Sequence, residues 1–141
     1  MGPEQIFMPF IGMLVLTFCV WLLMYRRRIN YIVANRIRPS QLKTPEQLQS
    51  LLPDEVSYPS YNLKNLFELP VVFYALVVYL YVTGQADMIY TVAAWLFFLL
   101  RCGHSFVHCT SNHVMTRFRF YAASSIVLWL MLGRAVLQLV I

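Results

Sequence analysis

Residues 6–25, IFMPFIGMLVLTFCVWLLMY, form an unbroken apolar stretch that is followed directly by Arg26, Arg27 and Arg28. A helix of about 20 residues rises roughly 1.5 Å per residue and so crosses the ~30 Å hydrocarbon core of a bilayer. No basic residue precedes the stretch, whereas a cleaved signal peptide carries its basic residues first. The segment therefore predicts a retained transmembrane helix.

Three further apolar stretches follow, at about residues 63–82, 88–109 and 118–140. The sequence of 141 residues is 60% hydrophobic and 12% charged, against roughly 25% charged in a typical soluble domain. It has too few polar residues to cover the surface of a soluble domain. We therefore predict an all-α integral membrane four-helix bundle, with residues 1–141 forming a single transmembrane domain.

The connection between the first two stretches, about residues 26–62, is predicted to be a cytoplasmic loop. Nothing breaks the first helix before Pro39, so that helix is expected to project through Arg36, and a polar loop is expected from about Pro39 to Lys64. Within it, Thr44 and Gln47 have the spacing of a capping box and predict a short surface helix. Pro53 and Pro59 follow and are expected to keep the chain extended or turning.

The loop charges predict an orientation. Most basic residues lie in the connection at 26–62, and Arg117 and Arg119 lie beside the last connection. The turn at 83–87 has no Lys or Arg. Because basic loops stay in the cytoplasm, we expect residues 26–62 to be cytoplasmic and both termini to be non-cytoplasmic.

Two classes of function are excluded by the distribution of charges and cysteines. The net charge of +5 resides beside apolar spans, so it indicates membrane orientation and no nucleic-acid partner. The three cysteines, Cys19, Cys102 and Cys109, are odd in number and lack CxxC spacing. They are interpreted as buried apolar thiols and not as a disulfide framework or a zinc site.

Ionisable residues inside the spans form a compact set. Such groups cost roughly 2.5–3.5 kcal/mol each on insertion scales and usually face the bundle interior. Residues three or four apart share a helix face, and all of these positions fall in the cytoplasmic half of the bundle. The set is Asn65 and Glu68 on the second span, Arg101, His104 and His108 on the third, and Arg117 and Tyr121 on the fourth.

Simpler interpretations of this set remain open. Glu68 and Arg101 can be a structural ion pair that joins two helices, and His104 and His108 can form hydrogen bonds between helices. The two histidines have metal-ligand spacing, but no third ligand matches, so no metal is predicted. Arg117 and Arg119 can be interfacial anchors.

These residues resemble the signatures of the MAPEG superfamily, membrane-associated proteins in eicosanoid and glutathione metabolism. The segment Lys64-Asn65-Leu66-Phe67-Glu68-Leu69-Pro70 is similar to the second-helix motif, and Arg101-x-x-His104 is similar to the third-helix motif. Arg117 matches an arginine that opens the fourth helix. The resemblance covers essentially the whole chain.

The resemblance implies a homotrimer that binds glutathione as a co-substrate between subunits, and a lipophilic small-molecule electrophile from the lipid bilayer. Arg117 is the expected catalytic residue, because a cation near the sulfur stabilises the thiolate. Glutathione carries two carboxylates and an ammonium group, so its site needs several cations and a carboxylate. The expected glutathione-binding residues are Arg27, Lys64, Asn65, Glu68, Arg101, His104, His108 and Tyr121.

Three positions depart from the family pattern. Tyr61 stands where an arginine is usual, His108 replaces a tyrosine, and Phe118 replaces the serine of the prostaglandin-synthase branch. The chain most resembles the bacterial-type members, which implies a bacterial inner membrane. The predicted function is a glutathione-dependent membrane transferase or peroxidase. The alternatives are a non-catalytic trimeric scaffold or lipid-binding protein, and a small transporter that uses Glu68, Arg101 and His104 as a relay.

Overall fold

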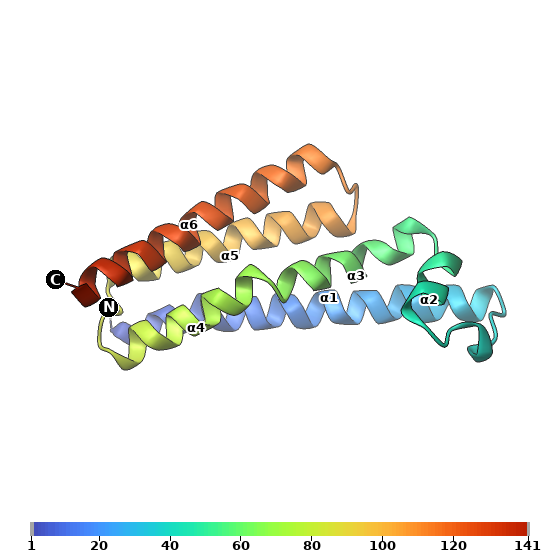
Figure 1. Cartoon of the computed structure of the whole chain (residues 1–141), viewed down its shortest axis with the longest axis horizontal. Helices are drawn as coiled ribbons and strands as arrows, with labels where there is room; N and C mark the ends of the chain where they lie inside the picture. The colour runs from blue at the N-terminus through green and yellow to red at the C-terminus, as the bar shows by residue number, and fades with distance from the viewer. Residues whose placement is uncertain (1, 141) are drawn as a thin grey trace.

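The chain folds into helices only, in a computed structural model that describes residues 2–140 (Figure 1). A 3-10 turn at Pro3–Ile6 leads into the first helix, and a second such turn lies at Pro39–Gln41. The α-helices are α1 (Phe7–Ala34), α2 (Pro45–Leu51), α3 (Asp54–Leu66), α4 (Leu69–Val82), α5 (Met88–Cys109) and α6 (Val114–Val140).

Four segments are long and apolar enough to cross a membrane, namely Pro3–Ala34, Asp54–Val82, Met88–Cys109 and Val114–Val140. They lie side by side along the long axis, and both chain ends lie at the same end of the bundle (Figure 1). We call this the terminal end, and the opposite end, which carries α2, the α2 end. The predicted all-α fold with four spanning helices is confirmed.

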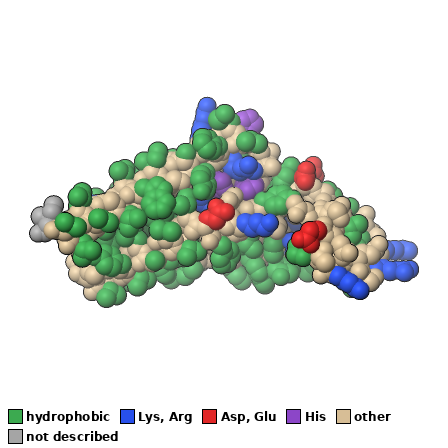
Figure 2. Space-filling view, in the orientation of Figure 1, with side chains coloured by type: hydrophobic (Ala, Val, Ile, Leu, Met, Phe, Trp, Pro, Cys, Tyr) green, Lys and Arg blue, Asp and Glu red, His purple; other side chains and the backbone are tan. Residues whose placement is uncertain are grey.

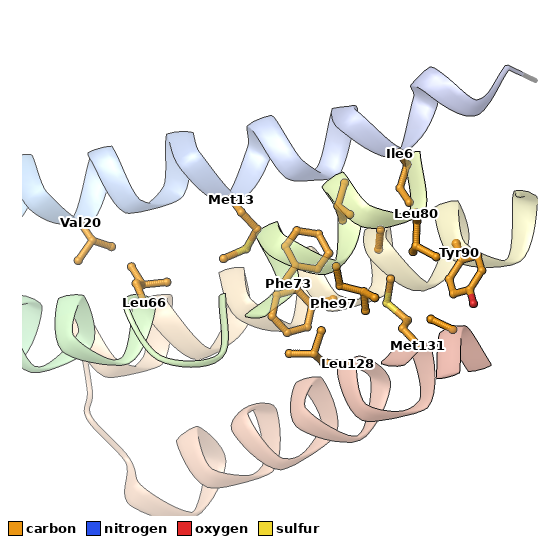
Figure 3. Close-up of a cluster of buried hydrophobic side chains, with 14 of the residues drawn as sticks. Ile6, Met13, Val20, Leu66, Phe73, Leu80, Tyr90, Phe97, Leu128 and Met131 are labelled. Atoms are coloured by element: carbon orange, nitrogen blue, oxygen red, sulfur yellow. The ribbon is translucent and has the colours of Figure 1, made fainter. Parts of the chain in front are cut away.

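Most of the apolar core lies in the half of the bundle nearer the terminal end, and the core extends to Val20 and Leu66 (Figure 3). Phe73 of α4 stacks on Phe97 of α5 with ring centroids 4.6 Å apart. Met13, Leu128 and Met131 from α1 and α6 complete the cluster, and all five side chains are buried. This packing joins α1, α4, α5 and α6 into one body and leaves the other half of the bundle for polar groups.

The first helix continues beyond the apolar stretch, as predicted, whereas the polar loop predicted from about Pro39 to Lys64 was wrong because that region is largely helical. α1 continues as far as Ala34 and α3 begins at Asp54. Between them, the predicted short helix is confirmed as α2, because the Thr44 hydroxyl accepts a hydrogen bond from the Gln47 N–H at 3.2 Å.

Pro59 lies inside α3, where we had expected an extended chain. A proline inside a helix removes one N–H and leaves the carbonyl four residues earlier without its partner. That carbonyl belongs to Glu55, and Arg27 of α1 donates to it at 3.0 Å. Asp54 and Glu55 also lie in the first turn, where acidic groups favour the helix dipole. A contact from another helix thus compensates for the proline.

The second span is interrupted between α3 and α4. Pro70 is the second residue of α4 and cannot donate a hydrogen bond back into α3. Glu68 lies at the break with a non-helical backbone, at φ −99° and ψ −102°. The Asn65 carbonyl, at the end of α3, accepts a hydrogen bond from the Glu68 N–H at 3.3 Å. A carbonyl oxygen has two lone pairs, so it can accept a second hydrogen bond from another donor.

An ion pair joins the turn before α5 to the last part of α6 at the terminal end. Arg134 donates to both carboxylate oxygens of Asp87, at 2.9 Å and 2.5 Å. The Arg134 guanidinium also lies 4.3 Å from the Tyr90 ring centroid. Its hydrogen bonds hold the pKa of the Asp87 carboxyl at about 2, below the ordinary value of 3.8.

We expect Asp87→Asn to lower the Tm of the purified protein slightly at neutral pH. The pair is largely exposed, so its contribution is no more than about 1 kcal/mol, and asparagine keeps the N-cap of α5. The folded-state pKa lies below the unfolded value, so this contribution is complete above about pH 4 and is lost towards about pH 2. The Tm difference from wild type should shrink over that range, and a constant difference would contradict a role for the carboxylate charge.

Candidate functional site

Polar side chains gather inside the bundle towards the α2 end. On the face shown in Figure 2, histidine, acidic and basic side chains lie over this half, and hydrophobic side chains cover the other. Such groups are costly at membrane depth and usually mark a functional region. We call the internal set the polar cluster, which consists of Asn62, Asn65, Arg101, His104, Ser105, His108 and Tyr121.

α5 supplies one wall of the polar cluster. Arg101, His104 and His108 are three and four residues apart, and all are buried. Their predicted common face is therefore confirmed, and it faces α3 and α6. Arg101 lies eight residues before the end of α5 at Cys109, which corresponds to a depth of about 12 Å.

Arg101 is completely buried, with a relative exposure of 0%. Its Nη2 donates to the Asn65 carbonyl at 3.0 Å, as the second hydrogen bond that this oxygen accepts. The guanidinium also lies 5.7 Å from the Tyr121 ring centroid. Among the described residues its Nε and Nη1 have no hydrogen-bond partner. Arg101 thus ties the α3–α4 break to α5 and keeps unused donors.

His104 connects α5 to the start of α6. Its Nδ1 lies 3.1 Å from the Arg117 carbonyl. A carbonyl only accepts hydrogen bonds, so Nδ1 carries the proton. The Nε2 atom is buried and has no partner within residues 2–140. His104 therefore has one nitrogen fixed and one free inside the cluster.

His108 faces α3 with the opposite arrangement. Its Nδ1 lies 3.5 Å from the side-chain nitrogen of Asn65. The amide nitrogen donates, so Nδ1 of His108 accepts and its proton is on Nε2. The two histidine rings are perpendicular, with centroids 5.5 Å apart. Within residues 2–140, no three His, Cys, Asp or Glu side chains lie close enough to share a metal ion.

Asn62 and Ser105 belong to the polar cluster but were not predicted from the sequence. The Ser105 hydroxyl donates to the Asn62 side-chain oxygen at 3.4 Å, and the Asn62 amide donates to the Cys109 sulfur at 3.6 Å. All three are buried. The missed signal was positional, because Asn62 precedes Asn65 by three residues and Ser105 lies on the same face as Arg101 and His108. Burial was predicted for all three cysteines and is confirmed for Cys109, but it was wrong for Cys19, which is exposed, and for Cys102, which is half-buried.

Arg117 reaches the polar cluster with its backbone and not with its side chain. Its carbonyl holds His104, while its Nη1 donates to the Asn112 side-chain oxygen at 2.5 Å. The guanidinium is thus directed towards the connection between α5 and α6 and is half-buried. Four of its five N–H groups remain for other partners.

Three of the expected binding residues lie outside the polar cluster. Arg27 is bound to the Glu55 carbonyl, and Lys64 is exposed with its amine 6.0 Å from the Tyr61 ring centroid. Glu68 is exposed at the α3–α4 break. Among the described residues, the only ion pair within 4.0 Å is Arg134 with Asp87. The structural ion pair considered for Glu68 and Arg101 is therefore not formed within the protomer.

A model of the MAPEG family matches residues 6–137 of the chain. The match runs through all four membrane-length segments and includes every residue of the polar cluster. Comparisons with curated proteins and with solved structures find no match. The family match and the four segments together identify an integral, multi-pass membrane protein.

Proposed function

The chain belongs to the MAPEG family, and on that premise we propose that it is a glutathione-dependent membrane transferase or peroxidase for lipophilic electrophiles. The observation that carries the proposal is the polar cluster. An amide, two histidines, an arginine and a tyrosine converge in one half of an otherwise apolar bundle. A bundle that needed only to fold would be expected to avoid this cost.

Exposed charges near the polar cluster support a site that a neighbouring subunit completes. Lys64 and Glu68 are exposed on one protomer, although they belong to a membrane-length segment. Charges at this depth need a partner or a water-filled cavity. In a homotrimer, Lys64 and Arg27 would face the glutathione carboxylates and Glu68 would face its ammonium group. Asn65, Arg101, His104, His108 and Tyr121 would hold the rest of the tripeptide.

Arg117 is the proposed catalytic residue. It lies three residues after the start of α6 at Val114, and its carbonyl contacts His104, so it lies at the edge of the polar cluster. A guanidinium beside the sulfur favours the thiolate, which is the nucleophile that attacks the electrophile. The hydrogen bond that Arg117 donates to Asn112 would hold the guanidinium while its other N–H groups face the sulfur.

An apolar groove of about 490 Å³ offers a place for the second substrate. It lies between α1 and the α3–α4 break and opens sideways. Phe67, at the break, is 65% exposed beside it. The groove is lined by Leu14, Thr17, Phe18, Trp21, Leu63, Leu66, Phe67, Val71 and Tyr74. An apolar electrophile dissolved in the bilayer could enter such a groove without crossing water.

The direct test is the ultraviolet difference spectrum of the purified protein on addition of glutathione. Thiolates absorb where thiols do not, so we expect a saturable absorbance, with one thiolate or fewer per protomer. S-methylglutathione, which cannot ionise at sulfur, should compete with glutathione but give no signal. No absorbance at saturating glutathione would contradict the proposal.

We expect Glu68→Gln to weaken glutathione binding by about tenfold or more, because it removes the partner of a ligand ammonium. The Tm without glutathione should be unchanged, since Glu68 has no ion-pair partner among residues 2–140 of the protomer. Glu55→Gln is the control, an exposed acid whose backbone carbonyl alone is engaged. A Tm loss in Glu68→Gln with unchanged affinity would instead indicate a structural role between subunits.

A non-catalytic trimeric scaffold or lipid-binding protein is the second candidate. It is favoured by Arg117, whose guanidinium already donates a hydrogen bond to Asn112. This candidate predicts that glutathione neither gives a thiolate signal nor raises the Tm.

We also propose that the α2 end is cytoplasmic and that both chain ends are non-cytoplasmic, as in a bacterial inner membrane. The basic residues between α1 and α3 support this orientation. A reporter that is active only in the cytoplasm should work when inserted in α2 and fail when fused after α6. The reverse pattern would overturn the orientation.

A further inference from the structure

A polar cavity of about 420 Å³ lies at the α2 end, apart from the polar cluster. It is enclosed by the last part of α1, by residues 42–52 and by α3. Arg28, Lys43 and Lys64 line it, and no Asp or Glu is among its lining residues. We call it the α2 pocket. Three cations around one cavity repel each other unless an anion lies between them.

The walls of the α2 pocket are already tied together. Arg28 of α1 donates to the Ser60 hydroxyl of α3 at 3.4 Å. Gln49 of α2 donates to the Tyr61 hydroxyl at 3.0 Å. Each hydroxyl thus accepts one bond and keeps its own O–H to donate. The pocket therefore presents two neutral donors beside three cations, which suits an oxygen-rich anion.

The place of the pocket indicates the kind of molecule that carries this anion. The apolar part of α1 ends at Tyr25, three residues before Arg28, so the pocket lies at the level expected for lipid headgroups. Leu42, Leu48 and Leu52 add an apolar side to the lining. Cations beside hydroxyls at the edge of apolar surface are the chemistry that phosphate-bearing lipids require.

We propose that the α2 pocket binds a phosphate group, supplied by the headgroup of an anionic phospholipid or by a soluble phosphate ester. The bound phosphate accepts hydrogen bonds from Arg28, Lys43 and Lys64, with Ser60 and Tyr61 completing the donor set. Lys64 is shared with the proposed glutathione site, whereas Arg28 and Lys43 are not assigned to it. Variants of Arg28 and Lys43 therefore test the α2 pocket separately from the proposed glutathione chemistry.

The test is a titration of the full-length protein in neutral detergent, with native mass spectrometry as the readout. One arm uses short-chain phosphatidylglycerol and the other uses glycerol 3-phosphate. We expect saturable binding of about one phosphatidylglycerol per chain, over a background of phosphatidylcholine. Binding of glycerol 3-phosphate as well would show that the phosphate ester alone suffices, and its absence would assign the site to a lipid. No saturable binding of either probe would overturn the proposal.

Two charge-matched double variants locate the site. Arg28→Gln/Lys43→Gln removes two lining cations, and Arg26→Gln/Arg36→Gln removes two arginines of the same segment that do not line the pocket. A cation near a lipid headgroup contributes about fivefold in affinity, so the first should bind roughly 25-fold more weakly. The second should change affinity by about twofold or less. Equal losses in both would mean diffuse attraction and no site.

A single variant, Lys43→Gln, distinguishes lost phosphate binding from lost folding. The Lys43 side chain is exposed and only its backbone N–H is hydrogen-bonded, to Gln47. Lys43→Gln should keep the wild-type Tm and helix content and still bind phosphatidylglycerol about fivefold more weakly. Wild-type affinity in this variant would exclude Lys43 from the site and overturn the three-cation assignment.

Discussion

Arg117→Ala should lower kcat for glutathione conjugation by about 100- to 1000-fold while weakening glutathione binding only modestly. A lost cation contact at a developing anion typically costs about 3–4 kcal/mol of transition-state stabilisation. The carboxylates of the tripeptide would still be held by the other cations, so most ground-state binding should remain. Stopped-flow measurement of the thiolate signal, with steady-state rates, separates these two effects.

Arg119→Ala is the matched control. Arg119 is exposed and lies two positions further along α6, on a different face of the helix. Its removal takes the same charge from the same region, so any general electrostatic effect should appear in both variants. Activity should stay near wild type. Equal losses in the two variants would remove Arg117 from the catalytic role and leave the non-catalytic candidate.

Asn112 determines where the Arg117 guanidinium lies. Because Asn112 accepts the Arg117 Nη1 donor, it is a positioning residue and does not itself touch the sulfur in the proposed site. Its backbone has a positive φ of 49°, which asparagine tolerates better than most residues. The side-chain contact and the backbone turn together fix where α6 begins, and therefore where the guanidinium can reach.

The face of α5 could be predicted from sequence because helical periodicity alone determines it. Arg101, His104 and His108 had to share a face once the segment was a helix, and the structure buries all three. The direction of the Arg117 guanidinium could not be predicted in this way. It depends on Asn112, a residue in a short connection whose side chain has no periodic constraint.

The structure of the region from Pro53 to Glu68 also could not be predicted from its local sequence. Local preference argued against a helix at Pro59, and the helix forms because Arg27, distant in sequence, donates to the freed Glu55 carbonyl. The same kind of replacement occurs at the end of α3, where Arg101 donates to Asn65. Both contacts are non-local, so no pattern within the segment itself reveals them. In each case an arginine from another helix donates to a carbonyl that regular helical hydrogen bonding leaves accessible.

Arg101→Met should abolish thiolate formation and leave the Tm close to that of wild type. Burying an arginine costs about 2.5–3.5 kcal/mol on insertion scales, whereas its hydrogen bond to the Asn65 carbonyl returns about 1.5–3 kcal/mol. The cost of burial and the stabilisation by the hydrogen bond nearly cancel. Methionine fills a similar volume without a charge, so the free energy of unfolding should change little. Glutathione binding should weaken, because the α3–α4 break that carries Asn65 and Glu68 loses its hydrogen bond to α5.

Phe97 lies on the same helix face as Arg101, one turn earlier, and Phe97→Ala should lower stability while leaving glutathione binding intact. Phe97 is buried and stacks on Phe73, and truncating a buried phenylalanine typically costs about 3–5 kcal/mol. This variant should lose stability clearly, yet its folded fraction should bind glutathione with near wild-type affinity. If Arg101→Met instead lost as much stability as Phe97→Ala and still gave a normal thiolate signal, Arg101 would serve the fold and not the site. The contrast between the two variants thus tests whether the buried guanidinium is kept for binding, at a position where an apolar side chain would serve the fold equally well.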